Sequence, residues 1–233
     1  MPSEEVRSSF NELLTLLSKT TLALYEKYEE QTNIQALPKR LLDSNPLKLA
    51  EAENVNSMQG FREAALTLLE SLYLDLRKEF LSISQGRKSR GGKSFEEQFA
   101  LLLKLADFPF QQQQAHLRTD FVLPSSSAFE RNRTSCVVAS LKRTLRERWQ
   151  EVAGELKQLQ APNVFLVTGD PKVSAGQVHG ICDVHRIHLV VRDSVKDKHP
   201  GNPLVLGFTE FANVRLPMLQ QQWATAGLGE RLL

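Results

Sequence analysis

Short apolar runs alternate with helical segments in the C-terminal half of the chain, and this alternation constrains the fold more than any other feature. Four apolar runs have the length and composition of β-strands, and they lie at residues 121–123, 135–141, 163–168 and 186–191. Helical character follows or separates them at about 144–159, 174–182 and 208–222. Strands that alternate with helices predict an α/β unit, in which a central mixed sheet is flanked by helices.

The N-terminal part of the chain has helical character. Apolar positions recur at helical spacing over residues 5–30 and again, more strongly, over residues 57–83. We therefore expect an N-terminal helical region at 1–84 and an α/β core at 85–233, together forming one compact domain. The broad apolar stripe at 61–80 is typical of a core helix or of a helix at a subunit interface.

A basic, glycine-bearing segment at residues 85–93 separates the two parts and predicts a loop. Its four cations are suited to contacting phosphates, although the composition equally fits a flexible surface loop. These cations are Arg87, Lys88, Arg90 and Lys93. Ser94 is the expected N-cap of a helix at 95–106. The glutamine run at 111–114 predicts a solvated turn.

Composition excludes several classes of protein. The chain has 233 residues, of which 41% are hydrophobic, and this is enough for a real core. Its net charge is only +2, so any nucleic-acid binding must depend on a local basic face. No apolar run approaches the length of a membrane span, and the acidic N-terminus lacks the apolar core of a signal peptide. We expect a soluble cytoplasmic protein whose two cysteines are reduced core residues.

Three charged residues lie where strands and helices enter or leave the expected sheet. Asp120 opens one apolar run, Lys142 closes the next, and Glu155 falls on the helix that follows. Taken singly, the three are typical of a turn or capping residue, a solvated strand end and a surface helix position. Together they indicate phosphodiester hydrolysis, which needs carboxylates to hold Mg²⁺ and a cation near the attacking water or the scissile phosphate.

The same residues resemble a known family. Asp120, then Ser140 and Lys142, then Glu155 thirteen residues on, resemble the permuted PD-(D/E)XK site of type II restriction endonucleases of the EcoRII-type, CCGG-reading subgroup. The common form of this site has an acidic residue two positions before the lysine. Here Ser140 occupies that position, and the acid has moved to Glu155. The resemblance covers roughly residues 85–220 and includes the segments 90–96, 146–149 and 187–191.

The resemblance implies a role for each residue of the site. Asp120 and Glu155 are the expected metal ligands, because carboxylates suit the hard Mg²⁺ ion. Lys142 would orient or deprotonate the attacking water, or stabilise charge on the phosphate. A further acid is expected on the helix after the glycine-bearing segment, acting on a metal through water. Glu96 matches this position best and Glu97 second, although an acid there also favours the helix dipole.

The triplet Arg146, Glu147 and Arg148 is expected to read DNA bases. Arginine pairs bidentately with guanine and glutamate accepts from cytosine, so the triplet suits adjacent C·G pairs. The alternative is a solvated charged turn. The resemblance implies a Mg²⁺-dependent endonuclease that cuts double-stranded DNA at a palindromic CC…GG site such as CCGG, CCNGG or CCWGG, leaving 5′-phosphates.

Two further partners follow from the same interpretation. We expect a homodimer, with the region at 1–84 acting as a dimerisation or DNA-contacting arm. A cognate DNA methyltransferase is expected in the same system, but not as a stable subunit. A helix at 61–80 that is wholly internal would place the dimer contacts elsewhere in the N-terminal half.

Other functions remain possible on the sequence alone. A non-catalytic DNA-binding module, a structure-specific repair nuclease of the same fold and a helical interaction protein are the alternatives. A zinc site is a further alternative, because four potential ligands recur at intervals of three residues, although a second coordinating pair at finger spacing is missing. These potential ligands are His179, Cys182, His185 and His188.

Overall fold

The computed structural model describes residues 2–31, 35–43, 58–114, 119–145 and 149–228. The chain divides into two compact units, one formed by residues 1–18 with 91–233 and the other by residues 19–90. Two long helices, α2 (Phe10–Glu29) and α5 (Met58–Leu105), each contribute residues to both units. Each unit is described by itself.

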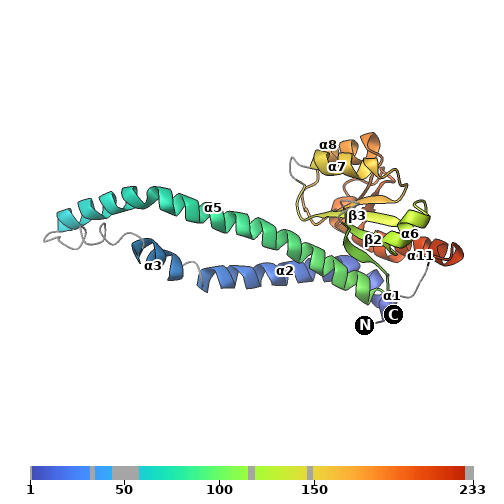
Figure 1. The fold of residues 1–233 in the computed structure, drawn as a ribbon, viewed down its shortest axis with the longest axis horizontal. Coiled ribbons are helices and arrows are strands. Elements are labelled where there is room, and N and C mark those ends of the chain that lie inside the picture. The colour runs from blue at the N-terminus through green and yellow to red at the C-terminus, as the bar shows by residue number, and fades with distance from the viewer. Residues whose placement is uncertain (1, 32–34, 44–57, 115–118, 146–148, 229–233) are drawn as a thin grey trace. The chain divides into compact units, whose positions relative to one another are not determined.

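The larger unit is built on a six-stranded sheet with the strands in chain order (Figure 1). The strands are β1 (Gln111–Gln114), β2 (Thr119–Leu123), β3 (Val137–Lys142), β4 (Val164–Thr168), β5 (His188–Val191) and β6 (Val205–Gly207). The first three strands are antiparallel, and β3 to β6 are parallel. The sheet is therefore mixed, as expected. All residues of β4 and all but the last residue of β3 are buried, which is typical of central strands.

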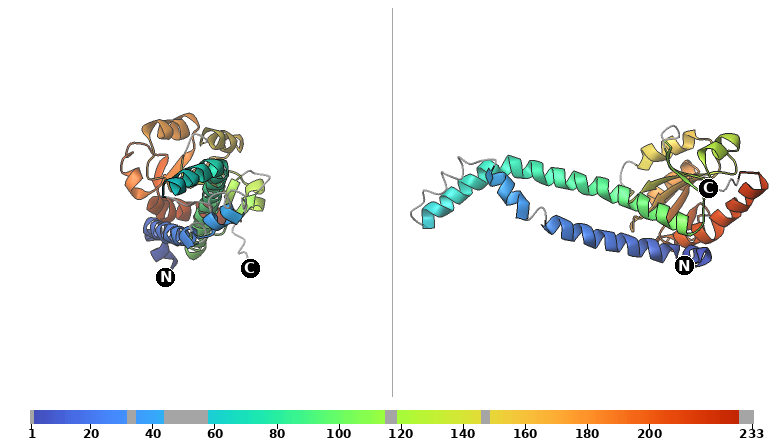
Figure 2. Two further views of the ribbon diagram at one scale, coloured as in Figure 1. Left: turned by 90° about the vertical axis from the view of Figure 1, so that its left-hand side faces the viewer. Right: turned by 60° about the horizontal axis from the view of Figure 1, so that its bottom comes forward.

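Helices cover both faces of this sheet. They are α1 (Ser3–Ser8), α6 (Ser126–Arg131), α7 (Trp149–Gln158), α8 (Ala175–Val178), η3 (His179–Val184), α9 (Asp193–Lys196), α10 (Phe208–Glu210), η4 (Phe211–Arg215) and α11 (Leu216–Thr225). Figures 1 and 2 show α7 on one side of the strands and α11 on the opposite side. The fold is the α/β core that the sequence predicts, with a mixed central sheet flanked by helices.

A chain of aromatic rings joins the helices to the sheet. Phe99 of α5 contacts both Phe10 of α2 and Phe121 of β2, with ring centroids 5.7 Å and 5.5 Å apart. Phe211 of η4 lies 6.2 Å from Phe99 and 5.2 Å from Phe165 of β4. All five rings are buried to within 1% of full burial. This cluster holds the end of α5 against the sheet.

The prediction of a loop at 85–93 is wrong, because α5 continues through this segment without a break. Two of its three glycines, Gly86 and Gly91, make room for arginine side chains. A Cβ on the buried Gly91 would fall against the Arg143 guanidinium, and a Cβ on Gly86 would come within 2.9 Å of Arg90. Ser94 accordingly lies inside the helix, where its hydroxyl accepts a hydrogen bond from Gln98 at 2.9 Å.

The glutamine run at 111–114 is also not a turn, since it forms the edge strand β1 and pairs with β2. Gln111 has a defined role, because its Oε1 accepts hydrogen bonds from the backbone and the hydroxyl of Ser126 at 2.9 and 2.7 Å. The strand β6 was not predicted. The helix expected at 144–159 is described only from Trp149 onward, and residues 143–145 precede it without helical structure.

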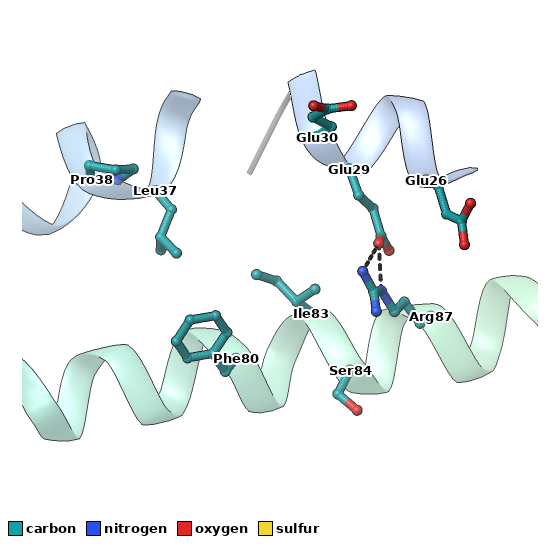
Figure 3. Close-up of a pocket in the computed structure, with 9 residues that line it drawn as sticks. All are labelled: Glu26, Glu29, Glu30, Leu37, Pro38, Phe80, Ile83, Ser84 and Arg87. Atoms are coloured by element: carbon teal, nitrogen blue, oxygen red, sulfur yellow. Dashed lines mark hydrogen bonds and ion pairs between the residues drawn. The ribbon is translucent and has the colours of Figure 1, made fainter. Parts of the chain in front are cut away.

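The smaller unit is helical. Within it, α2, α3 (Gln35–Asp43) and α5 line an open pocket of about 670 Å³ (Figure 3). Glu29 of α2 lies on the wall of the pocket with only 7% of its surface exposed, and it is paired with Arg87 and Arg90 of α5. Among the helices described in either unit, none is both long and apolar enough to cross a membrane.

Candidate active site

Asp120 and Ser140 face each other across the antiparallel pair β2–β3. Phe121 is paired with Ala139, and this register places Asp120 directly opposite Ser140. The Ser140 hydroxyl donates to Oδ2 of Asp120 at 3.1 Å, and the backbone N–H of Leu141 donates to the same oxygen at 2.5 Å. Two donors from β3 therefore hold one oxygen of the Asp120 carboxylate.

Lys142 ends β3 beside this carboxylate. Its Nζ lies 3.6 Å from Oδ2 of Asp120, and the two side chains are 39% and 24% exposed. Lys142 is also paired in register with Thr168, the last residue of the parallel strand β4. The ion pair therefore lies at the carboxyl edge of the parallel strands, where open α/β sheets commonly bind ligands.

The geometry of Asp120 fits a hard divalent cation. Within the described residues, no hydrogen bond reaches its second oxygen, Oδ1. Mg²⁺ retains several waters and is commonly held by only one or two carboxylates, so one oriented and partly exposed carboxylate meets its main requirement. Within the same residues, no three His, Cys, Asp or Glu side chains come together as a metal-binding group.

The other expected acids lie on helices. Glu155 is exposed on α7, and Glu96 is partly buried on α5 with Glu97 exposed beside it. Glu97 lies 3.9 Å from Lys93 in an exposed i,i+4 pair. The structure therefore brings Asp120 and Lys142 together with Ser140, while neither Glu155 nor Glu96 is part of a larger acidic group among the described residues.

The basic residues that were expected to contact DNA fall into two groups, the triplet at 146–148 and the cations of α5. Arg146, Glu147 and Arg148 lie outside the described residues. Arg87 donates from its guanidinium to Glu29 (Figure 3), and Arg90 lies 3.2 Å from the same carboxylate. The hydrogen bond from Arg87 is the main reason that the pKa of Glu29 is held below its usual range.

The residues of the zinc alternative have separate structural roles. Burial raises the pKa of the Cys182 thiol to about 12, which disfavours the thiolate that zinc binds. Burial also lowers the pKa of His188 to about 4, and its ring stacks on Phe165 with centroids 4.7 Å apart. His179 is paired with Asp183 at 2.9 Å.

Ser140 and Leu141 are the site residues that sequence reasoning missed. Ser140 stood out only as the position that lacks an acid, and its contact with Asp120 follows from the strand register. The signal that would have found it is the antiparallel pairing of β2 with β3, because directly opposed side chains in such a pair approach within contact distance.

Comparison with solved structures defines the class of protein. The chain is similar to Ecl18kI in a metal-depleted complex with uncleaved, modified DNA, with a TM-score of 0.81 and 24% identity over 96% of this chain and 74% of that chain. It is also similar to PspGI in a complex with substrate DNA, with a TM-score of 0.54 and 20% identity over 84% of this chain and 93% of that chain. The fold is therefore that of a restriction endonuclease.

Sequence comparison identifies the family. The family described as EcoRII C terminal matches residues 64–212. The type II restriction enzyme SsoII of Shigella sonnei is 25% identical over 224 residues, which cover 91% of this chain and 70% of that protein. The chain therefore belongs to the EcoRII C-terminal family and is an EcoRII-type restriction endonuclease, a site-specific deoxyribonuclease.

Proposed function

We propose that this protein is a Mg²⁺-dependent endonuclease that cuts double-stranded DNA at a palindromic CC…GG site and leaves 5′-phosphates. The observation that carries the proposal is the Asp120 carboxylate, fixed by β3 and paired with Lys142 at the carboxyl edge of the sheet. The Ecl18kI and PspGI structures are both complexes with DNA, which supports the same substrate.

The proposed roles of the acids follow from their chemistry. Asp120 would hold the cation, with its carboxylate oriented by the hydrogen bonds from β3 to Oδ2. Glu155 completes the ligand set in place of the acid that Ser140 replaces, and Glu96 or Glu97 acts through water. When bound, Mg²⁺ would polarise the phosphoryl oxygen and lower the pKa of a coordinated water.

Lys142 acts on the nucleophile or on the phosphate. Its ammonium group lies beside the Asp120 carboxylate and is partly exposed, so a phosphate at the edge of the sheet could reach it. From this position Lys142 can orient the attacking water and stabilise negative charge that develops on the scissile phosphate. The Asp120–Lys142 contact keeps that ammonium group at the metal-binding carboxylate.

Base reading is assigned to the Arg146–Glu147–Arg148 triplet. Arginine contacts to guanine and a glutamate contact to cytosine would specify the CC and GG half-sites. Arg87, Lys88, Arg90 and Lys93 contribute phosphate contacts from the helix α5, and Arg87 and Arg90 would exchange or share their contact with Glu29.

A palindromic target needs two identical DNA-recognition surfaces, which a two-fold symmetric dimer supplies. The smaller unit offers a surface for that dimer, because large apolar side chains are exposed on α2 and α5. On the α5 part these include Leu66, Leu69, Tyr73, Leu74, Phe80 and Leu81, all more than half exposed. The enzyme works on cytoplasmic DNA, and a separate methyltransferase protects the host sites without forming a stable complex with it.

Incubation of the purified protein with plasmid DNA and Mg²⁺ tests the function. Discrete fragments that share one end sequence would support site-specific cleavage, and sequencing of the ends would give the site and the 5′-phosphate. A smear would indicate a non-specific nuclease. Unchanged plasmid with tight DNA binding would indicate a non-catalytic DNA-binding protein.

A further inference from the structure

Leu145, three residues after Lys142, has both of its backbone polar groups held by side chains from other elements. Its N–H donates to Oδ2 of Asp170 at 2.9 Å, and its carbonyl accepts from Nε2 of Gln177 at 2.8 Å. The Leu145 side chain is also buried, with 5% of its surface exposed. A residue in a connection between a strand and a helix is rarely fixed on both sides in this way, because loop backbone is commonly solvated.

Gln177 is itself immobilised by a capping box at the start of α8. The side-chain Oε1 of Gln177 accepts from the backbone N–H and the hydroxyl of Ser174 at 2.9 and 3.1 Å. The backbone N–H of Gln177 donates to the Ser174 hydroxyl at 3.2 Å, which completes the capping box. The amide oxygen therefore serves the cap, and the amide nitrogen is directed to the Leu145 carbonyl. One side chain links the helix start to the connection after β3.

Asp170 is held just as firmly at the end of β4. Its Oδ1 accepts from the backbone of Lys172 at 2.9 Å, which leaves Oδ2 for Leu145. Its own N–H donates to the hydroxyl of Thr168, a fully buried residue paired with Lys142. The carboxylate is thus tied to the strand next to the one that carries Lys142.

The helix on the far side of the triplet starts from a second anchor. α7 begins at Trp149, whose indole packs so closely on Gly180 of η3 that a Cβ there would overlap the ring. Trp149 also packs against the hydrophobic core. The residues on either side of the triplet, Leu145 and Trp149, are therefore both held by contacts with other elements.

We propose that Asp170 and Gln177 are positioning residues for base recognition, forming a clamp on Leu145 that sets where the chain enters the Arg146–Glu147–Arg148 triplet. This inference rests on the proposed reading role of that triplet. A bidentate base contact discriminates only when the side chain is delivered at the correct place, so fixing the entry point beforehand reduces the ordering cost of specific binding. Contacts to phosphates tolerate displacement, so loss of the clamp should reduce specific binding more than non-specific binding.

Gln177→Glu separates the clamp from the cap. It keeps the oxygen that accepts from Ser174, since Glu also serves in capping boxes, but it replaces the donor to Leu145 with an oxygen. Gln177→Met removes the donor without adding charge, and it also removes the oxygen that accepts from Ser174. Asp170→Asn weakens the other side of the clamp. Gln98→Glu is the matched control, because Gln98 is a buried glutamine on α5 that donates to the Ser94 hydroxyl at 2.9 Å.

The measurement is the ratio of affinities for a duplex carrying the cleavage site mapped on plasmid DNA and for a random duplex, with Ca²⁺ in place of Mg²⁺. We expect each clamp variant to lower this ratio about tenfold, within the range of one lost base contact. Gln177→Met should leave the affinity for random DNA close to that of wild type, while its melting temperature falls because the cap and the donor to the Leu145 carbonyl are lost. Gln98→Glu should keep the wild-type ratio.

Arg148→Ala provides the reference for base reading. If Arg148→Ala lowers the ratio and the clamp variants do not, the clamp is overturned while the proposed reading role stands. An equal loss for Gln98→Glu would also overturn the clamp, since it would show a general loosening of the fold. If Arg148→Ala leaves the ratio unchanged, the proposed reading role fails, and the clamp proposal that depends on it fails as well.

Discussion

Ser140 and Asp120 show how one hydroxyl can orient a carboxylate. The carboxylate of Asp120 would rotate freely on an exposed strand end, but Ser140 and Leu141 hold Oδ2 from the neighbouring strand. Rotation is then restricted and Oδ1 stays available. Asp120 was singled out from the sequence, whereas its contact with Ser140 was not, because the contact depends on the register between two strands.

Ser140→Ala should weaken metal binding more than it weakens the fold. Partners that orient a metal ligand typically contribute about 10–100-fold to metal affinity or activity, and we expect a rise of roughly tenfold in the half-saturating Mg²⁺ concentration. Calorimetric titration with Ca²⁺ should show the same shift without any catalysis. At saturating Mg²⁺, cleavage should recover most of the wild-type rate.

Thr119→Val is the matched control for that change. Thr119 is a buried hydroxyl residue on β2 beside Asp120, but it donates to the carbonyl of Ala139 at 2.9 Å and not to the carboxylate. Both variants should lose about 1 kcal/mol of stability. Equal metal affinities for the two variants would mean that Ser140 is only structural.

At the level of elements, the central strands and both ends of α5 were predictable, whereas the continuity of α5 through residues 85–93 was not. The strands β3 and β4 are continuous apolar runs of a length typical of buried strands, so their burial is visible in the sequence. Each glycine in a helix costs about 1 kcal/mol relative to alanine, which explains why the segment at 85–93 resembled a loop. The contacts that offset this cost come from residues distant in the sequence. Arg143 packs at Gly91, and Glu29 pairs with Arg87 and Arg90 of α5.

The adjacent glycines of α5 give a direct test of this explanation. Nothing lies within 4 Å of a Cβ built on Gly92, whereas one on Gly91 meets the Arg143 side chain. Gly92→Ala should therefore stabilise the protein by up to about 1 kcal/mol, and Gly91→Ala should gain less because Arg143 must move. Urea unfolding of both variants measures the difference, and equal stabilisation would contradict the role assigned to Gly91.

At the level of the whole molecule, the exposed apolar surface of the smaller unit predicts self-association. The sequence could not say whether the stripe at 61–80 faces the interior, but the structure leaves Leu69, Tyr73 and Phe80 more than half exposed. Large exposed apolar patches typically mark interaction sites. Light scattering at micromolar concentration should give about twice the mass of one chain.

Leu69→Glu should then shift the protein toward monomer, because a charge would be buried in the dimer contact. Leu101→Glu, on the same helix and 46% exposed against 57% for Leu69, is the control and should leave the dimer intact. A monomeric wild-type mass, both free and on cognate DNA, would refute the dimer and imply sequential nicking by single chains.

Stability of the whole fold should also depend on His188. Its pKa is lowered to about 4 by burial and by the nearby charge of Arg215, against 6.5 as the usual value. Between these values the unfolded chain binds a proton that the folded chain does not, so stability is complete above pH 6.5 and falls as the pH falls toward 4. We expect a loss of about 2 kcal/mol between pH 7 and pH 5.

His188→Phe should flatten this pH dependence, because phenylalanine preserves the ring stacked on Phe165 and cannot titrate. Urea unfolding at pH 7, 6 and 5 measures it. An unchanged slope in His188→Phe would show that other groups dominate the acid sensitivity.

The proposed division of roles has Asp120 and Lys142 performing the chemistry while other residues bind the DNA. Its most direct test measures cleavage in Mg²⁺ and gel-shift binding in Ca²⁺ for Asp120→Ala and Lys142→Ala. We expect each variant to lose at least about 100-fold in cleavage rate and to retain specific binding of the mapped site. Cleavage at a near-wild-type rate by either variant would contradict the assignment of this pair as the catalytic site.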